Sequence, residues 1–269
     1  MTGSADTAHR FLALHHGDAP LILPNAWDRG SAKLFEALGF DAVATTSAGH
    51  AATLGRLDGR VTRDEALAHA RDLVDAVGLP VSADFENAFA DAPADVAANI
   101  TLAVETGLAG CSVEDYDGTA LYDAALATER VAAATEAAHT GGHAFVITAR
   151  AENFLRGNPD LADTIARLQS FQEAGADVLY APGLPDLDAI RAVVAAVDRP
   201  VNVLALPGAP PVAELRTAGV KRISVGSGFS LVAQGAAITA AKELLERGTY
   251  DWWSVAAPAF TLTHEVFES

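Results

Sequence analysis

The most constraining feature of this sequence is a regular alternation between short apolar segments, typical of buried strands, and longer segments typical of helices. The apolar segments are bounded by Gly, Pro or polar residues and occupy residues 21–25, 41–46, 81–84, 110–114, 143–149, 177–181, 201–204 and 222–225. Each is followed by a helix-like segment. Because a parallel connection needs a crossover, usually a helix, this alternation predicts a parallel sheet.

The helix-like segments have recognisable ends. Gly39 ends the helix predicted at 31–38, and Thr62 with Glu65 forms a capping box at the start of the next helix. The other predicted helices are 5–15, which leads the chain, and 94–105, 124–139, 161–174, 187–197, 212–218 and 230–247. Eight strand–helix units predict an α/β fold, a (β/α)₈ TIM-type barrel. An open doubly wound sheet is the alternative, because periodicity does not reveal closure.

The length fits a single barrel. Barrels of this class use about 200 to 250 residues as one unit, and no linker divides the 269 residues. We therefore predict one domain over 1–269, with a leading helix in 1–17 and a C-terminal extension at 248–269. Half of the residues are apolar and a fifth are charged, which supports a large core.

Charge and cysteine content narrow the classes of partner and compartment. The net charge of −17 argues against nucleic acid and acidic membranes, which attract clustered Lys and Arg. A small anionic carboxylate substrate must therefore meet local positive charge. The single cysteine excludes an intramolecular disulfide and fits a cytoplasmic protein. No apolar run approaches the roughly 18 residues of a membrane span, and no basic region with an apolar segment opens the chain.

Polar side chains collect where the predicted strands end. Asp84 and Glu86 follow one strand and share a face if the extended geometry persists, and Glu114 ends the next strand. Carboxylates suit Mg²⁺, which takes one or two from the protein and keeps several waters. A solvated acidic loop is the alternative reading of Asp84 and Glu86. The strand-end set is Asn25, Thr46, Ser47, Asp84, Glu86, Glu114, Asp115 and Arg150.

These motifs resemble those of a known superfamily. They are Asn25-Ala26-Trp27-Asp28, Thr45-Thr46-Ser47-Ala48-Gly49, Gly55-Arg56-Leu57-Asp58, Ala83-Asp84-Phe85-Glu86, Glu114-Asp115 and Ala149-Arg150. In this order the chain resembles the isocitrate lyase and phosphoenolpyruvate mutase superfamily from about residue 10 to residue 250. The resemblance implies a Mg²⁺-dependent barrel that makes or breaks C–C or P–C bonds in small 2-oxo or 2-hydroxy acids through enolate-like intermediates. It also implies a dimer of dimers that exchanges its last barrel helix.

The resemblance assigns roles by position. It implies that Asp84 binds Mg²⁺ (or Mn²⁺) directly and that Glu86 and Glu114 assist through water. The resemblance also implies that Thr46, Ser47 and Ala48 bind the substrate and that Asp58 is a catalytic acid near the metal. It implies that Arg150 binds the substrate and stabilises the developing enolate.

The chain departs from the family pattern at two places. Glu86 stands where the family usually has a second Asp, and Ala88-Phe89-Ala90 replaces a Gly-Tyr-Gly-like run, so the metal surroundings are expected to differ. The loop 115–122 lacks the cysteine of the cysteine-dependent lyases and the lysine of the phosphonate mutases.

Other reactive residues have simpler interpretations. Cys111 lies in an apolar strand and is expected to be a buried core residue rather than a nucleophile. His50, His139 and His143 lack partners at metal-ligand spacing and are expected to be structural, with His50 the one nearest the substrate turn. Trp252 and Trp253 are expected in packing or at an interface.

The functional hypothesis is a Mg²⁺-dependent lyase, decarboxylase or hydrolase acting on a small 2-oxo or 2-hydroxy dicarboxylate. P–C bond chemistry on a phosphonate such as phosphonopyruvate is one alternative, and a metabolite-binding barrel without turnover is another. A phosphosugar enzyme is a further rival, because residues 206–209 and 225–228 follow the last two strands, where many barrels bind phosphate.

Overall fold

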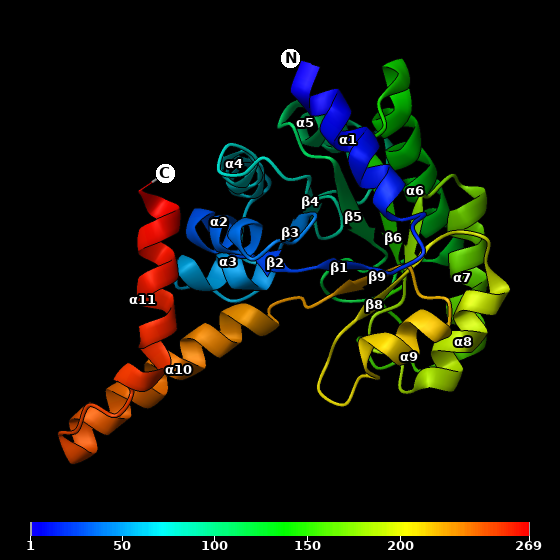
Figure 1. The fold of residues 1–269 in the computed structure, drawn as a ribbon. Coiled ribbons are helices and arrows are strands. Elements are labelled where there is room, and N and C mark those ends of the chain that lie inside the picture. Colours follow the sequence, from blue (N-terminus) through cyan, green and yellow to red (C-terminus); the bar gives the residue numbers. More distant parts are fainter. Residues whose placement is uncertain (1, 269) are drawn as a thin grey trace.

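The computed structural model describes residues 2–268 and shows a closed parallel barrel (Figure 1). Within these residues every strand pairing is parallel, and the strand order is β1-β9-β8-β7-β6-β5-β4-β3-β2. The strands are β1 (Leu21–Leu23), β2 (Asn25–Ala26), β3 (Val43–Thr45), β4 (Val81–Asp84), β5 (Gly110–Glu114), β6 (Val146–Arg150), β7 (Val178–Tyr180), β8 (Val201–Leu204) and β9 (Arg222–Ser224). The predicted TIM-type barrel is confirmed.

Closure depends on the first predicted strand, which the structure divides at Pro24. Its first part, β1, pairs with β9, and its second part, β2, pairs with β3. The side chain of Asn25 joins the two seams, because Nδ2 donates to the carbonyl of Thr45 (2.7 Å) while Oδ1 accepts from the amides of Val225 and Gly226 (3.0 and 2.9 Å). One stretch of chain therefore bridges both edges of the sheet and excludes the open alternative.

Helices alternate with the strands along the chain, as predicted. They are α1 (Thr2–Leu14), α2 (Arg29–Ala37), α3 (Ser47–Thr53), α4 (Arg63–Val74), α5 (Pro93–Glu105), α6 (Ala124–His139), η1 (Thr140–Gly142), α7 (Leu161–Glu173), α8 (Leu187–Ala196), α9 (Val212–Thr217), α10 (Gly228–Arg247) and α11 (Trp253–Phe267). The capping box of Thr62 and Glu65 opens α4 as predicted. The short α3 was missed, since its first residues read as a substrate turn.

The leading helix α1 packs against the amino ends of the strands. Phe11 is fully buried, and its ring lies 3.2 Å from where a Cβ on Gly110 would stand. The same Cβ would lie 2.5 Å from the carbonyl oxygen of Val146, so only glycine fits there. The amino end of the barrel is thus closed by α1, and access from solvent is left to the carboxyl end.

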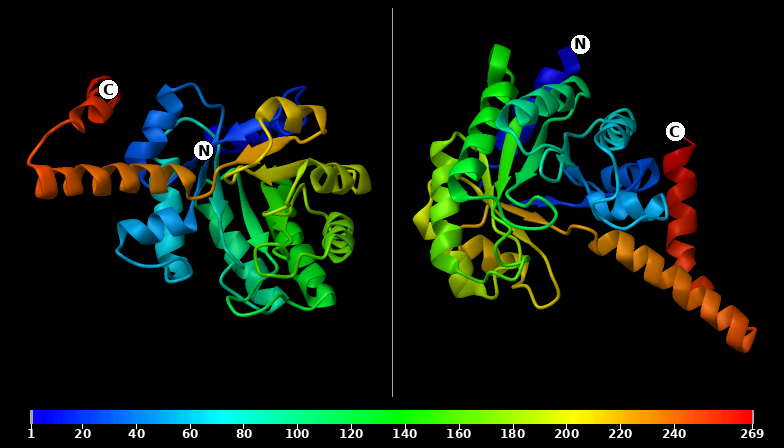
Figure 2. Two further views of the ribbon diagram at one scale, coloured as in Figure 1. Left: turned by 90° about the horizontal axis from the view of Figure 1, so that it is seen from below. Right: turned by 180° about the vertical axis from the view of Figure 1, so that it is seen from behind.

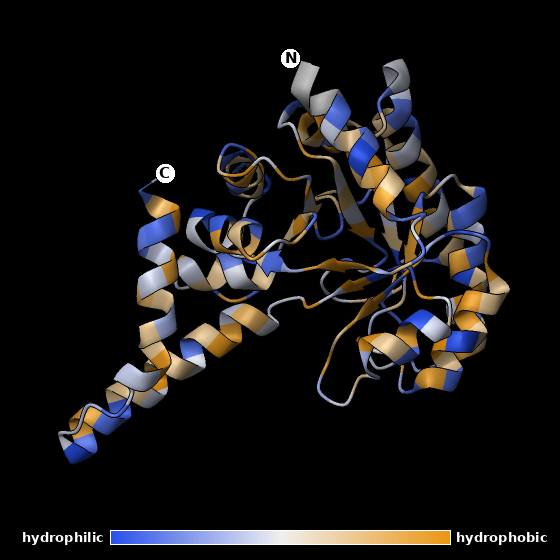
Figure 3. Ribbon diagram, viewed as in Figure 1, coloured by the Kyte–Doolittle hydropathy of each residue, from blue (hydrophilic) through white to orange (hydrophobic). Residues whose placement is uncertain are grey.

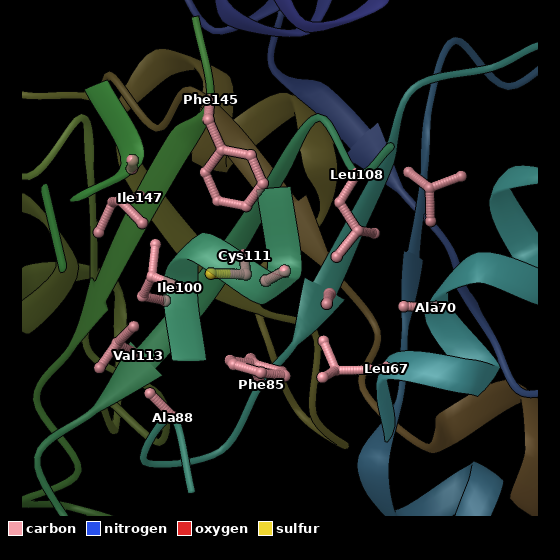
Figure 4. Packing of buried hydrophobic residues seen from close by; sticks show 14 of the residues in the cluster. Leu67, Ala70, Phe85, Ala88, Ile100, Leu108, Cys111, Val113, Phe145 and Ile147 are labelled. Carbon is pink, nitrogen blue, oxygen red and sulfur yellow. The ribbon is translucent and has the colours of Figure 1, made fainter. Parts of the chain in front are cut away.

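Cys111 lies in the apolar layer between the sheet and its outer helices (Figure 4). Its side chain is fully buried near Phe85, Ile100 and Ile147, and burial raises the pKa of the thiol far above its usual range. We expect Cys111→Ser to leave turnover within about threefold, because an un-ionised thiol is a poor nucleophile. Steady-state kinetics and thiol alkylation of the native protein check this. A folded but inactive serine variant would contradict it.

Two buried histidines, His15 and His69, lead us to expect that the free energy of unfolding falls in acid. Burial lowers the pKa of His15 and of His69 to about 3 in each case. Because these folded pKa values lie below the unfolded value, their contribution is complete above about pH 6.5 and declines as pH falls toward 3. Between pH 6.5 and 5 the decline amounts to up to about 2 kcal/mol per histidine.

Urea unfolding at pH 7 and pH 5 measures this decline. We expect the fall in unfolding free energy to be smaller in His69→Gln than in the native protein. His143→Gln, at an exposed position, serves as the control and should leave the fall unchanged. An equal fall in His69→Gln would show that His69 does not contribute.

The C-terminal part of the chain leaves the barrel. Helix α10 extends away from it, and α11 returns to lie along α2 (Figures 1 and 2). Both helices carry apolar residues along their length (Figure 3). Large exposed apolar side chains on them are Phe229, Leu231, Val232, Ile238, Leu244, Leu245, Trp253, Val255, Phe260 and Phe267. Among the described residues, no helix has both the length and the apolar character needed to cross a bilayer.

Candidate active site

A cavity of about 790 Å³ opens at the carboxyl ends of the strands. All the site residues predicted from the sequence line it: Thr46, Ser47, Ala48, Asp58, Asp84, Glu86, Glu114 and Arg150. The first three follow β3, and Asp84, Glu114 and Arg150 end β4, β5 and β6. Asp58 is exposed in the loop before α4. The barrel therefore gathers residues that are far apart in sequence around one space.

Asp84 is held by groups from three strand ends. Its Oδ2 accepts hydrogen bonds from the backbone N–H and the hydroxyl of Ser47 (3.1 and 2.8 Å). Its Oδ1 accepts from Nη1 of Arg150 (2.8 Å) and from the hydroxyl of Ser112 (3.4 Å). Thr46 uses its hydroxyl to cap α3 at the amide of Gly49. In this structure the predicted substrate turn thus orients the predicted metal ligand.

Arg150 is surrounded by carboxylates. Its guanidinium lies 2.8 Å from Asp84, 3.4 Å from Glu114 and 2.7 Å from Glu152. Burial acts to lower the pKa of Arg150, but the negative charges of Glu152, Glu114 and Asp84 together raise it well above its usual value. The guanidinium also lies over the ring of Tyr180, 5.1 Å from its centre. Arg150 therefore stays charged and fixed in orientation.

The surroundings of Glu86 and Glu114 disfavour the charged form of each carboxyl group. Burial, followed by the charges of Asp84 and Asp58, raises the pKa of Glu86 to about 7. Burial and the carboxylates of Glu152 and Asp84 raise the pKa of Glu114 to about 8, against the opposing effect of Arg150. Oε1 of Glu86 is buried without a hydrogen-bond partner.

These features fit a divalent cation, which would supply the missing positive charge and a partner for the orphaned oxygen. Within residues 2–268, no three His, Cys, Asp or Glu side chains are gathered closely enough to enclose a metal by themselves.

Glu86 reaches the cavity by a different geometry from the one predicted. The strand ends at Asp84, as predicted, and the chain then turns sharply, so the extended geometry that would place Asp84 and Glu86 on one strand face does not persist. Glu86, Ala88 and Phe89 have φ values of 48°, 59° and 55°, in the left-handed region that favours glycine. Ala88 stands where the family pattern has its first glycine, and it adopts this left-handed backbone at a conformational cost.

Arg130, which the sequence analysis missed, supports this turn. The residue is 1% exposed, and it donates from Nη1 to the carbonyl of Glu114 (3.1 Å) and from Nη2 to that of Ala90 (2.8 Å). A third hydrogen bond joins it to the carbonyl of Asn87. Its guanidinium lies 4.0 Å from the ring centre of Tyr122. One buried cation thus fixes the backbone that presents both Glu86 and Glu114.

Glu152 and Arg156 are further site residues that the sequence analysis missed. Glu152 is fully buried and accepts from Nε and Nη2 of Arg150 (3.0 and 2.7 Å). Arg156 lines the cavity and forms ion pairs with Glu152 (3.1 Å) and Glu114 (3.8 Å), so Arg150 is not the sole cation at the site. The signal was present in Ala149-Arg150-Ala151-Glu152, where the acid follows the arginine by two residues.

Asp115 supports the site from behind. It accepts the backbone N–H of Glu152 (2.8 Å) and pairs with Arg167 (3.0 Å), and it is 2% exposed. Asn25 has a structural role at the place where the barrel closes. Its Oδ1 accepts hydrogen bonds from the amides of Val225 and Gly226, which a phosphate would need as donors. That occupancy weighs against the phosphosugar reading.

His50 does not line the main cavity. Its ring stacks on that of His69 at 3.8 Å between centres, and both line a small adjoining pocket that shares Asp84 and Glu86 with the main cavity. Burial lowers the pKa of His50. The histidine pair packs α3 against α4, in agreement with the structural role expected for His50.

Comparison with known proteins places this site in a family. The sequence model of the family described as phosphoenolpyruvate phosphomutase matches residues 11–245. The chain belongs to this family. The relatives of the chain include an uncharacterized protein of Mycobacterium tuberculosis, 36% identical over 219 residues that make up 81% of each chain. The 2-methylisocitrate lyase of Escherichia coli is 30% identical over 193 residues, 68% of this chain and 64% of that one.

The fold comparison agrees. A crystal structure of a protein from Burkholderia cenocepacia superposes with a TM-score of 0.96 at 46% identity, covering 99% of this chain and 98% of the other. The resemblance read from the strand-end motifs is thereby confirmed. The phosphoenolpyruvate phosphomutase family is one of lyases and mutases, so the cavity belongs to an enzyme fold whose members act on small carboxylates.

Proposed function

We propose that this protein is a Mg²⁺-dependent enzyme that cleaves a C–C bond in a small 2-oxo or 2-hydroxy dicarboxylate through an enolate-like intermediate. The observation that carries the proposal is the placement of Arg150 on the cavity wall, held by Asp84, Glu114 and Glu152. A charged, preorganised donor in a closed site stabilises an oxygen that gains negative charge. The lyase activity named for the Escherichia coli relative supports this reading.

The proposed metal ligands are Asp84 directly and Glu86 and Glu114 through water. When bound, Mg²⁺ would supply Lewis-acid stabilisation of the enolate-like oxygen. Mn²⁺ would satisfy the same oxygen ligands. Asp58 raises the pKa of Glu86 from the mouth of the cavity, so its proposed role is an acid near the bound substrate.

The residues of the chain would divide the remaining work. The Arg150 guanidinium would bind a substrate carboxylate or carbonyl oxygen with a fork of two N–H groups. Thr46, Ser47 and Ala48 would line the same end of the substrate from the turn after β3. Arg156 would offset the negative field at the cavity mouth, where it is 35% exposed.

The loop 115–122 bears on the choice between reactions. Asp117 accepts the amides of Thr119 and Ala120 (2.6 Å each), and Tyr116 bridges to Leu121, so the loop is a compact turn. Burial raises the pKa of Tyr122 to about 12, and its hydroxyl donates to Asp91. A general acid for the leaving fragment must therefore come from a group other than a loop cysteine or lysine.

Turnover assays test the proposal. A panel of 2-oxo and 2-hydroxy dicarboxylates, oxaloacetate among them, is assayed with and without Mg²⁺, with phosphonopyruvate as a separate arm. We expect Mg²⁺-dependent cleavage of a dicarboxylate. Turnover of phosphonopyruvate alone would assign P–C chemistry instead, and binding without turnover across the panel would assign a metabolite-binding barrel.

We further propose that the protein is a homo-oligomer, a dimer of dimers in which the C-terminal helices pack on a neighbouring protomer. Its support is the row of exposed apolar side chains on α10 and α11, since monomers rarely expose large apolar patches. Val232 and Leu245 on α10 are 70% and 86% exposed.

Sedimentation analysis tests the oligomeric state. We expect the native protein to sediment as a fourfold multiple of its 27.8 kDa mass, and Val232→Glu with Leu245→Glu to reduce that mass. Leu57→Glu, which changes an apolar residue that is 81% exposed in the loop between α3 and α4, is the matched control and should leave the mass unchanged. A monomeric native protein would contradict the proposal.

A further inference from the structure

The interior of the barrel beneath the strand ends is unusually polar. In most TIM barrels this layer is filled by bulky branched residues. Here the cavity continues down to a set of polar side chains: Ser82, Ser112, Tyr180, Asn202, Arg222 and Ser224. Ser82 and Ser112 stand two residues before Asp84 and Glu114 and so share their inward face. Small side chains at these positions leave the space below the site open.

Arg222 is the charged member of this set. It is 4% exposed, donates from Nε to Oδ1 of Asn202 (3.0 Å), and has Nη1 3.3 Å from Nε2 of His15. Among residues 2–268, no Asp or Glu forms an ion pair with Arg222, and the titratable side chains that act on it are those of Tyr180 and Arg150. Burial lowers the pKa of Arg222 to about 10, so it is still charged at neutral pH.

The other buried arginines show why this is unusual. Arg150 and Arg167 have carboxylate partners, and Arg130 binds three backbone carbonyls. A buried charge without a counter-charge is costly unless something else neutralises it. Because Arg222 and Asn202 both line the cavity, a ligand in the cavity can supply the missing negative charge.

We propose that Arg222 and Asn202 form a second substrate subsite at the base of the cavity, for the distal carboxylate of the substrate. The inference rests on the proposed function, which places the reacting end of the substrate at Arg150 and Asp84. Arg222 precedes the strand-end residue Ser224 by two positions, or about 7 Å along the strand, which suits an extended dicarboxylate of roughly four or five carbons. Such a subsite would select dicarboxylates over monocarboxylates.

Calorimetric titration with three ligands tests the subsite in the presence of Mg²⁺. Oxalate probes the upper end of the cavity alone, and racemic malate and racemic lactate differ by one distal carboxylate. We expect the native protein to bind malate at least tenfold more tightly than lactate (about 1.4 kcal/mol). Arg222→Gln should remove most of this preference while oxalate affinity stays within about twofold. Retained preference in Arg222→Gln, or no preference in the native protein, would overturn the subsite.

Two further variants cover a failure of Arg222→Gln to fold. Asn202→Ala keeps the guanidinium and should weaken malate binding severalfold without changing oxalate binding; unchanged malate binding would count against the subsite. His15→Gln removes the contact with Arg222 from below, and should lower Tm but keep the preference for malate. Loss of that preference in His15→Gln would indicate that Arg222 acts only through the packing of α1. Absence of oxalate binding to the native protein would instead reject the proposed function, and the subsite with it.

Discussion

Arg150→Lys is expected to lower kcat by about 10²-fold or more, the scale seen when one preorganised donor is removed from an active site. Lysine keeps the positive charge, but it cannot reproduce the guanidinium geometry. Arg150 uses Nε and Nη2 on Glu152 while Nη1 reaches Asp84. A single ammonium group in this position cannot satisfy Glu152 and Asp84 and also present a fork to the substrate.

Steady-state kinetics on the substrate found in the panel measure this effect. The affinity for Mg²⁺ without substrate should change little, because Arg150 is not a proposed metal ligand. Arg156→Lys is the matched control, since Arg156 lines the same cavity and pairs with Glu152 and Glu114 but is 35% exposed. It should stay within a few fold of the native rate. Near-normal kcat with a raised KM in Arg150→Lys would mean that Arg150 contributes only uniform binding.

Asp84→Asn is expected to abolish measurable Mg²⁺ binding and turnover. The change keeps the size of the side chain but removes the negative charge proposed to contact the metal. Because substitutions one shell away from a metal cost up to about 10²-fold in affinity, loss of the direct ligand should cost at least that. The amide nitrogen also cannot accept from Ser47 or Arg150, as the carboxylate oxygens do.

Calorimetric titration with Mg²⁺, without substrate, measures the loss directly. Asp117→Asn is the control, because Asp117 also lines the cavity but is exposed on the loop after β5. Its Mg²⁺ affinity should equal that of the native protein. Thermal melting shows whether Asp84→Asn remains folded. Equal Mg²⁺ affinity in Asp84→Asn and the native protein would remove Asp84 from the metal site.

The residues that hold Arg150 and the Glu86 turn in place lie outside the motifs recognised in the sequence. Glu152 is fully buried and fixes Arg150, while Arg130 fixes the turn that carries Glu86. Each bond is specific to one orientation of the donor, which is what preorganisation of a site requires. The charged side chains of the cavity are therefore held in fixed orientations by buried hydrogen bonds.

The sequence predicted a parallel α/β fold and the strand-end residues that would lie together, but it left closure of the sheet open. The spacing of apolar residues along each strand and helix indicates which face is buried. Parallel strands of one barrel place all their carboxyl ends at one edge. Asp84, Glu114 and Arg150 could therefore be assigned to one cavity from their positions alone. Cys111 could likewise be placed in the core from its apolar neighbours.

The way in which those residues are held depends on contacts that form only in the folded protein. Local preference argues against left-handed backbone at Glu86, Ala88 and Phe89, and the turn is fixed by Arg130, about 40 residues away in the chain. The lone charge of Arg222 could not be recognised either, because periodicity marks an inward position but not which partners stand around it.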